Sequence, residues 1–334
     1  MNAISTVYHA IRGGVAFNPV TDIPPLNGKV ILVTGGNAGL GKSAIQQLAA
    51  HSPARIYLAS RDASRAQSAI ADITRAVPSA GSIIKPLSLD LTSFASIKAA
   101  AQEVLSESSR LDILMLNAGI MATPAATTQE GYEIQFGTNH VGHALLTTLL
   151  LPLLLRTASA QLQEGQETGG RPDVRVVVLT SMAHRFTAPG GIAFSTLKSA
   201  GPQNLYSTWA RYGQSKLANI LFAKELARRY PQLTVVAVHP GVVNTNLMSP
   251  FSQQYLAARL ALHAAGWILA TPDQAVRQQL WAATAKEGIE SGEYYHPVGV
   301  AGFASAWAKD EELARRLWEW TEKELEGQVV EGTN

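Results

Sequence analysis

Five short, nearly continuous apolar runs constrain the fold of this 334-residue chain more than any other feature. Runs of this length that are rich in Val, Ile and Leu are typical of strands buried on both faces of a parallel sheet. Helix-length periodic segments separate them, so the pattern predicts an α/β fold with a doubly wound parallel sheet, right-handed crossovers and helices on both faces. The expected strands are Val30–Thr34, Arg55–Ser60, Asp112–Asn117, Arg175–Thr180 and Thr234–His239, with a weaker one around Ser82–Leu89, and the expected helices lie near 40–51, 63–76, 93–108, 131–157 and 207–230.

The composition is that of a folded, soluble protein. Apolar residues make up 46% of the chain and charged residues 16%, which is enough for a large buried core. A net charge of +2, without a run of Lys or Arg, argues against nucleic-acid binding. The absence of cysteine excludes disulfides, thiolate catalysis and Cys-ligated zinc. No segment has the roughly 18 apolar residues of a membrane span, so we expect a cytoplasmic protein; the alternative, peripheral membrane contact, would use the amphipathic stretch Tyr255–Leu269.

One domain with additions at both ends is the expected organisation. Pro24 and Pro25 block a helix just before the first strand. The polar, glycine-containing segment Gln161–Pro172 predicts a surface loop, and Ser291–Gly299 is expected to end the sheet. The expected parts are an N-terminal extension at 1–27, a main domain at 28–300 and a C-terminal helical extension at 301–334, with further helices near 252–269, 272–287 and 309–326.

A glycine-rich turn, Gly35-Gly36-Asn37-Ala38-Gly39-Leu40-Gly41, directly follows the first expected strand and leads into a helix. Glycines let the backbone turn sharply and approach a pyrophosphate, which binds at the positive end of such a helix. Strand-to-helix turns also need glycine for purely steric reasons. In this strand–turn–helix context the turn predicts a dinucleotide site that includes Gly35, Asn37, Gly39, Leu40 and Gly41.

The end of the second expected strand bears on the choice between NAD(H) and NADP(H). An NAD site usually has an acidic residue here that binds the ribose hydroxyls. This chain has Ser60 and Arg61 instead, and a guanidinium would pair with the 2′-phosphate of NADP(H). The neighbouring Asp62 would either pair with Arg61 or cap the next helix, and we expect the capping role. The sequence therefore predicts NADP(H) as the cofactor.

Tyr212 and Lys216 form a Tyr-x-x-x-Lys pattern in the fifth expected helix. Positions i and i+4 share one face of a helix, so the phenol and the ammonium can face the same site. A nearby cation favours the phenolate, and we therefore expect Lys216 to lower the pKa of Tyr212. A tyrosine of this kind can exchange a proton with an alcohol or a ketone near neutral pH, so the pattern predicts a carbonyl or alcohol oxidoreductase.

Taken together, these motifs resemble the short-chain dehydrogenase/reductase family, whose fold is a Rossmann-type sheet. The matching motifs span residues 29 to about 245 in the family's order, and the spacing between Ser181 and Tyr212 resembles the retinol-dehydrogenase and WW-domain-oxidoreductase-like branch. The resemblance implies further cofactor contacts. These are Asp90 and Leu91 at the adenine; Asn117, Ala118 and Gly119, with Leu116 replacing the first asparagine of the Asn-Asn-Ala-Gly motif; and Pro240, Gly241, Val243 and Thr245, in the stretch that contacts the nicotinamide carboxamide.

The resemblance also implies a catalytic set of Asn139, Ser181, Tyr212 and Lys216. Tyr212 would be the acid in reduction and the base in oxidation, and Ser181 would donate a hydrogen bond to the substrate oxygen. Lys216 would also hold the nicotinamide ribose, so that it and Tyr212 both contact the cofactor. Asn139 would position a water that joins Lys216 to solvent, and a structural role as a backbone-bonded residue in its helix would coexist with this one. No metal is expected, because nothing near His140 and His143 completes a ligand set.

The substrate is expected to be a lipophilic small-molecule carbonyl or alcohol, because the segments expected to cover the site, 184–211 and 246–270, are rich in apolar anchors. The alternative for the first segment is a packed surface loop. A secondary-metabolite intermediate is the favoured substrate, and a retinoid- or steroid-type dehydrogenase is the alternative. A catalytically silent NADP(H)-binding redox sensor is the other alternative, which the intact catalytic set disfavours. By resemblance, helices 131–157 and 207–230 could form a homodimer contact.

Overall fold

A parallel sheet of seven strands in the order β3-β2-β1-β4-β5-β6-β7 organises the protein. The computed structural model describes residues 14–165, 172–201, 204–241 and 272–329. Every neighbouring pair of strands is parallel, and the strand order reverses between β1 and β4. The predicted doubly wound, Rossmann-type α/β fold is therefore confirmed. The strands are β1 Val30–Thr34, β2 Arg55–Ser60, β3 Ile84–Ser88, β4 Ile113–Leu116, β5 Arg175–Leu179, β6 Thr234–Val238 and β7 Tyr294–Tyr295.

The apolar runs predicted the strands well because the sheet is covered on both faces. All residues of β1, β4 and β5 are buried, so neither face of these strands needs polar residues and the sequence shows no alternation. The weaker strand predicted before Asp90 is present as β3, and the strand expected within Ser291–Gly299 is β7.

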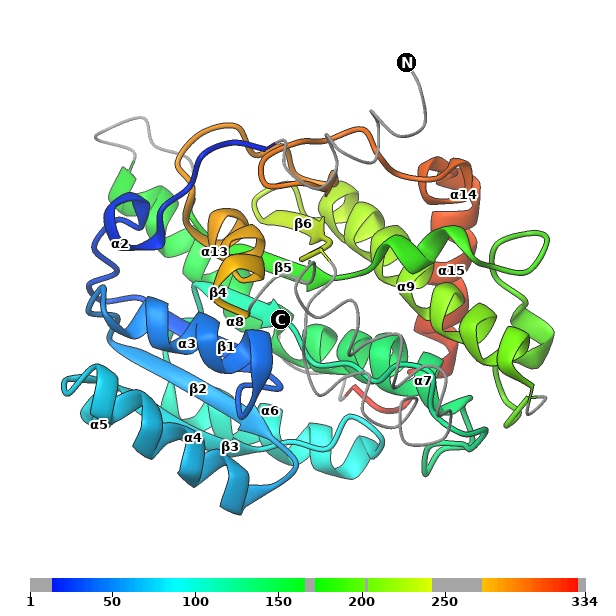
Figure 1. Cartoon of the computed structure of the whole chain (residues 1–334), viewed down its shortest axis with the longest axis horizontal. Coiled ribbons are helices and arrows are strands. Elements are labelled where there is room, and N and C mark those ends of the chain that lie inside the picture. The colour runs from blue at the N-terminus through cyan, green and yellow to red at the C-terminus, as the bar shows by residue number, and fades with distance from the viewer. Residues whose placement is uncertain (1–13, 166–171, 202–203, 242–271, 330–334) are drawn as a thin grey trace, which may run out of the picture.

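Helices cover both faces, with α3, α4 and α13 in front of the sheet in Figure 1 and α6 and α8 behind it. Short polar side chains start several of them: Asp62 accepts a hydrogen bond from Arg65 N at the start of α4, and Asn204 accepts one from Ser207 N at the start of α9. The helices are α2 Pro19–Asp22, α3 Gly39–Ala49, α4 Ala63–Ala76, α5 Ala80–Ile83, α6 Phe94–Glu107, α7 Ile134–Phe136, α8 Gly142–Gly165, α9 Leu205–Arg229, α12 Pro272–Ala275, α13 Arg277–Thr284, α14 Ala306–Lys309 and α15 Glu311–Glu324, with a π-helical turn at Gly137–Val141 and 3₁₀ turns at Met182–Arg185 and Phe194–Thr196.

Two hydrophobic cores lie on opposite faces of the sheet. One joins the sheet to α6, α8, α9 and α15, and the other joins it to α3, α4 and α13. The second core also contains Phe17, Ile23 and Leu26. The described part of the N-terminal extension is therefore packed against the main domain.

Helix α8 is longer than the sequence predicted. It continues to Gly165, so the prediction of a loop that begins at Gln161 is wrong for its first residues. Gln, Leu and Glu in this stretch are good helix formers, and the helix ends at the first glycine. The continuous helical stretch Ile134–Glu164 is long and apolar enough to span a membrane by length and composition, but 67% of its most apolar window is buried inside the protein, as in the core helix of a soluble protein.

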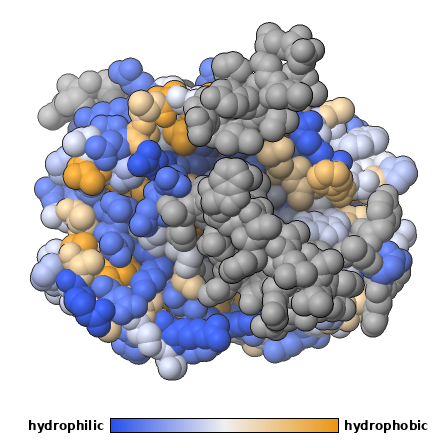
Figure 2. Space-filling model, viewed as in Figure 1, coloured by the Kyte–Doolittle hydropathy of each residue, from blue (hydrophilic) through white to orange (hydrophobic). Residues whose placement is uncertain are grey.

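The C-terminal extension packs against α9 through α15. Leu313, Leu317 and Trp318 of α15 are buried, and the Trp318 ring stacks on Phe222 with 5.5 Å between centroids. α9, one of the helices on which the resemblance places a subunit contact, is thus partly covered by the chain's own C-terminal helix; the homodimer stays a prediction. Figure 2 shows that the left half of the outer surface in this view is mainly hydrophilic with small hydrophobic groups.

Candidate active site

The carboxyl ends of β1 and β4 meet where the strand order reverses. In doubly wound sheets a ligand binds in the crevice at this point. Thr34, the last residue of β1, connects the two strands: its Oγ1 accepts a hydrogen bond from Ala118 N at 2.9 Å, and its carbonyl oxygen accepts one from Asn117 Nδ2 at 2.8 Å. The two predicted cofactor motifs, the glycine-rich turn and Asn117–Gly119, therefore lie side by side.

The glycine-rich turn has the backbone of a phosphate cradle. Gly35 has a φ of +68°, a conformation that costs little only for glycine. A Cβ on Gly41 would lie 2.3 Å from Gly35 O, so the start of α3 can approach the turn only if residue 41 is glycine. Ala38 precedes α3 and supplies no side-chain cap, which leaves the first N–H groups of the helix available to an anion. These features fit a dinucleotide pyrophosphate.

The side chains at the end of β2 have separate partners. Asp62 caps α4 by accepting from Arg65 N at 3.0 Å, and its carboxylate lies 3.3 Å from Arg65 Nε. Asp62 therefore has the predicted capping role. Arg61 is exposed and forms no ion pair with any residue that the structure describes, so its guanidinium is available to a ligand. The Ser60 hydroxyl is buried and bonds the backbone of Asp62.

Several other predicted cofactor residues have structural roles. Leu91 is buried in the core, so only its main chain could contact a cofactor. One carboxylate oxygen of Asp90 accepts from Thr92 N and Thr92 Oγ1. Gly241 follows β6 with a φ of +87°, next to the half-buried Pro240. Val243, Thr245 and the expected substrate segment 246–270 lie outside the described residues.

Tyr212 and Lys216 face the same site from α9, as predicted. Both side chains are buried, and Lys216 Nζ lies 5.8 Å from the centroid of the Tyr212 ring. Lys216 Nζ donates to Leu179 O at 3.2 Å, at the end of β5. A Cβ on Gly119 would lie 3.3 Å from Lys216 Nζ, so the segment after β4 packs directly against this ammonium group.

The expected direction of the Tyr212 pKa is wrong. Burial raises the pKa of Tyr212 to about 12, and a hydrogen bond with Ser181 opposes this effect only in part. Burial also lowers the pKa of Lys216 to about 8. Desolvation disfavours the charged form of both groups. Without a bound cofactor, this desolvation has a larger effect on the two pKa values than the attraction between the ammonium and a phenolate. The site therefore holds a neutral phenol beside an amine that can lose its proton just above neutral pH.

Asn139 lies in the π-helical turn before α8, an irregularity that is frequent at functional sites. Its Oδ1 accepts from Ile120 N at 2.8 Å, and its Nδ2 donates to Ile120 O at 3.0 Å and to Ser215 Oγ at 2.9 Å. The side chain thus connects the segment after β4 to the helix of Tyr212 and Lys216. These contacts match the structural role of Asn139, and the water-positioning role stays a prediction.

The two histidines near Asn139 have hydrogen-bond partners. His143 Nε2 lies 2.9 Å from Thr34 Oγ1, and His143 Nδ1 lies 3.0 Å from Asn139 O. His140 Nε2 lies 3.0 Å from Thr321 Oγ1 in α15. The sequence predicted packing or helix-face hydrogen bonding for these histidines, but not that His143 joins β1 to the turn that carries Asn139. The spacing of four residues between Asn139 and His143 is the only local signal of this contact.

Ser181 follows β5 and begins the 3₁₀ turn Met182–Arg185, with its Oγ accepting from Ala183 N at 3.1 Å. This turn lies against α9 at Gly213, where a Cβ would come within 2.1 Å of Phe186 O. Glycine next to Tyr212 therefore lets the Ser181 turn reach the tyrosine. Of the four predicted catalytic residues, Ser181, Tyr212 and Lys216 meet where the end of β5 faces the interior of α9, and Asn139 supports them through Ser215.

Comparison with known proteins agrees with this geometry. The sequence profile of short chain dehydrogenases matches residues 29–205. The chain belongs to the short-chain dehydrogenase/reductase family. It is 39% identical over 315 residues to the short-chain dehydrogenase/reductase drtF of Aspergillus calidoustus, an alignment that covers 91% of this chain and 95% of the relative. It is 37% identical over 319 residues to human retinol dehydrogenase 13, covering 92% and 86%.

A crystal structure of a Mycobacterium paratuberculosis protein superimposes with a TM-score of 0.67 at 29% identity, covering 92% of this chain and 97% of that chain. The predicted family and its retinol-dehydrogenase-like branch are confirmed by these relatives. This short-chain dehydrogenase/reductase is therefore a nicotinamide-dependent oxidoreductase by family.

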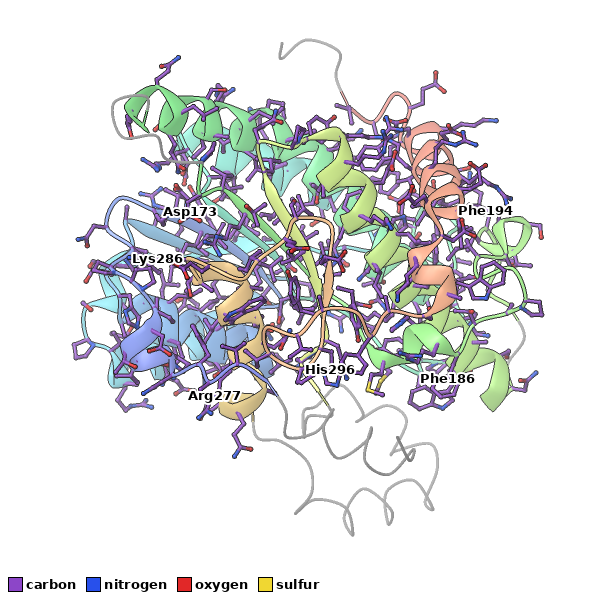
Figure 3. The ribbon with its side chains drawn as sticks, turned by 90° about the horizontal axis from the view of Figure 1, so that it is seen from above. Asp173, Phe186, Phe194, Arg277, Lys286 and His296 are labelled. Atoms are coloured by element: carbon purple, nitrogen blue, oxygen red, sulfur yellow. The ribbon has the colours of Figure 1, made fainter. Side chains whose placement is uncertain are left out.

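The 184–211 segment of this short-chain dehydrogenase/reductase has a packed middle and an exposed first part, and its role as a substrate wall stays a prediction. Its middle is packed: Leu197 is buried, and its carbonyl oxygen accepts from Glu133 N at 2.8 Å. Phe194 lies beside α15 (Figure 3), with its ring 6.2 Å from that of Trp320. The first part is different, because the Phe186 side chain is 68% exposed.

Proposed function

We propose that the protein is an NADP(H)-dependent oxidoreductase that transfers hydride between nicotinamide and the carbonyl or alcohol carbon of a lipophilic small molecule, with Tyr212 as the acid or base. The observation that carries the proposal is the group formed by half-buried Ser181 and buried Tyr212 and Lys216 at the carboxyl edge of the sheet. It lies next to a turn whose glycines fit a pyrophosphate.

In reduction, the Tyr212 phenol donates its proton to the substrate oxygen. A pKa raised to about 12 by burial keeps this phenol protonated at neutral pH, which suits an acid. The Ser181 hydroxyl donates a hydrogen bond to the same oxygen and stabilises the negative charge that develops on it. Bound nicotinamide supplies or accepts the hydride. Lys216, whose pKa lies near 8 because of burial, can return a proton to the tyrosine.

Arg61 supports NADP(H) over NAD(H). Its exposed guanidinium is placed at the end of β2, and Asp62 is engaged with α4 and Arg65. The Arg61 guanidinium is therefore available to a 2′-phosphate, whereas the Asp62 carboxylate is already engaged and is not available to the ribose hydroxyls.

Arg61→Ala should weaken NADPH binding much more than NADH binding in calorimetric titrations. Arg65→Ala, which removes a neighbouring cation, should not. Equal losses for the two cofactors in Arg61→Ala would refute the assignment.

Exposed apolar side chains beside the site support a lipophilic substrate. Met182 and Phe186 are 42% and 68% exposed and flank the turn that starts at Ser181. Contiguous exposed apolar surface marks ligand-binding sites, whereas exposed apolar residues scattered singly do not. Several relatives, such as human retinol dehydrogenase 13, carry retinol, a lipophilic alcohol, in their names. For this chain we propose two kinds of lipophilic substrate: a secondary-metabolite intermediate, or a retinoid or steroid.

NADPH oxidation in the presence of decanal, retinal and aromatic ketones tests the proposed reaction. Tyr212→Phe removes only the hydroxyl, so turnover should be lost while the NADPH dissociation constant changes by less than about twofold. Tyr57→Phe is the matched control and should keep turnover. Tyr57 is a buried tyrosine in β2 whose hydroxyl bonds Ser108. Full turnover by Tyr212→Phe would remove the assigned role.

A further inference from the structure

His184 connects the catalytic turn to the C-terminal extension. The side chain is fully buried. Its Nδ1 lies 2.7 Å from Ser181 O, and its Nε2 accepts a hydrogen bond from Ser305 N at 3.1 Å. The two partners are more than 120 residues apart in the sequence, on either side of the imidazole ring. No cofactor motif and no predicted catalytic residue explains this arrangement.

The two hydrogen bonds define the protonation state of the ring. A carbonyl oxygen only accepts, so Nδ1 must carry a proton; a backbone N–H only donates, so Nε2 must carry none. His184 is therefore neutral and has its proton on Nδ1. Burial agrees with this state, since it lowers the pKa of His184 to about 4. The ring also packs edge-on against Tyr294 of β7, with 5.1 Å between centroids.

The same histidine holds Ser181 from two directions. Ser181 O accepts both His184 N, at 3.0 Å, and His184 Nδ1. Ser181 Oγ accepts from Ala183 N and lies near enough to the Tyr212 phenol to oppose part of the rise in the pKa of that phenol. The backbone position of Ser181 sets where its Cβ and hydroxyl lie, and that position is restrained by a side chain that is itself anchored at Ser305.

A second contact joins the same two segments. The Arg185 guanidinium donates to Phe303 O. Arg185 directly follows His184 in the turn, and Phe303 lies two residues before Ser305. Phe303 and Trp307 are 36% and 41% exposed, and a Cβ on Gly191 would touch Trp307. The C-terminal segment 303–309 thus runs along the 3₁₀ turn and brings apolar side chains to the part of the protein where Phe186 is exposed.

We propose that His184 is a positioning residue that orients Ser181 and fastens the C-terminal segment 303–309 to the catalytic turn. The proposal rests on the proposed function, in which the Ser181 hydroxyl binds the substrate oxygen. The hydrogen-bonded chain runs from Ser305 through the imidazole to Ser181, so a change at the C-terminal segment alters the placement of the serine hydroxyl without contacting substrate.

The tautomer tests the link without any need for turnover. Two-bond ¹H–¹⁵N correlation spectra of histidine-labelled protein, assigned by comparison with His184→Gln, report which ring nitrogen carries the proton. The link requires His184 to be neutral with the proton on Nδ1 at pH 7. A proton on Nε2, or a cationic ring at this pH, would overturn it even if the protein reduced no carbonyl.

Kinetics with NADPH and decanal test the positioning. His184→Ala should lower kcat about 100-fold, because a displacement of about 1 Å of a reacting group costs this much, with the NADPH dissociation constant unchanged. His184→Asn keeps a donor near the Nδ1 position and should recover at least about tenfold of this loss. A kcat for His184→Ala within about twofold of wild type, or no recovery in His184→Asn, would overturn the proposal.

Variants at Ser305 test the far end of the link and leave Ser181 and His184 themselves unsubstituted. Ser305 has a φ of −68°, which proline can adopt, so Ser305→Pro replaces the N–H donor with a ring carbon that faces His184 Nε2 and breaks the link without straining the backbone. Ser305→Ala keeps the N–H and loses only the helix cap to Ala308 N. Ser305→Pro should lower kcat about tenfold and Ser305→Ala should not. Equal kcat values in the two variants, with an active wild type, would overturn the link but leave the proposed function in place.

Discussion

Replacement of Lys216 by methionine should stabilise the protein at neutral pH while abolishing its activity. Burial lowers the pKa of Lys216 from 10.5 to about 8. Each tenfold change in proton affinity is worth about 1.4 kcal/mol, so the charged side chain costs the folded state about 3 kcal/mol at pH 7. The methionine side chain has a similar length and no charge. It loses the hydrogen bond from Nζ to Leu179 O, worth about 1 kcal/mol, but Leu179 O keeps its bond from Asn219 Nδ2.

The net gain at pH 7 is therefore about 2 kcal/mol, and it depends on pH in a defined direction. Between pH 8 and 10.5 the unfolded chain binds a proton on Lys216 that the folded protein does not. The stability of the wild type therefore rises with pH across this window. At pH 10 the remaining cost of the lysine is below about 1 kcal/mol, and the advantage of Lys216→Met should vanish.

Urea unfolding at pH 7 and at pH 10 measures both quantities, with the variant expected to show a higher midpoint at pH 7 and an unchanged slope. Lys224→Met is the matched control on the same helix, since Lys224 is partly exposed and its ammonium lies 3.6 Å from Glu311; its effect should stay within about 0.5 kcal/mol. A Lys216→Met protein that is less stable than wild type at pH 7, or that keeps its advantage at pH 10, would contradict the burial argument.

Three further outcomes follow from the described contacts. Carbonyl reduction should fall about tenfold per pH unit above pH 8, because Lys216, with a pKa of about 8, loses the proton that it passes to the tyrosine; a kcat/KM that stays flat to pH 10 would contradict this. Trp318→Ala should cost about 3–5 kcal/mol of unfolding free energy by cavity formation, since the ring is only 7% exposed, whereas Trp307→Ala, at a site 41% exposed, should cost less than about 1 kcal/mol. Glu133→Gln should lower the free energy of unfolding by about 3 kcal/mol, because this buried carboxylate lies 3.0 Å from Arg211 Nε. A decrease below about 1 kcal/mol in urea unfolding, which is typical of an exposed ion pair, would show that the buried pair does not stabilise the protein.

The sequence by itself determined the features that depend on neighbouring residues. The bounds of β1 and β2 agree with the apolar runs, because strands buried on both faces need uninterrupted apolar residues. The cap of α4 at Asp62 and the shared face of Tyr212 and Lys216 follow from spacing along a helix. The order of motifs along the chain was sufficient to identify the family, and the sheet then places them at one edge.

Only the tertiary structure decided how charges and distant segments behave around these residues. The pKa of Tyr212 rises instead of falling because the surrounding elements remove water from the phenol, and the extent of that burial is a property of the whole fold. The burial of Leu91 in the core and the contact of His184 with Ser305 likewise join elements that are far apart in the sequence. Such contacts leave no periodic pattern, because each is made by one side chain whose partner is chosen by how the helices pack on the sheet.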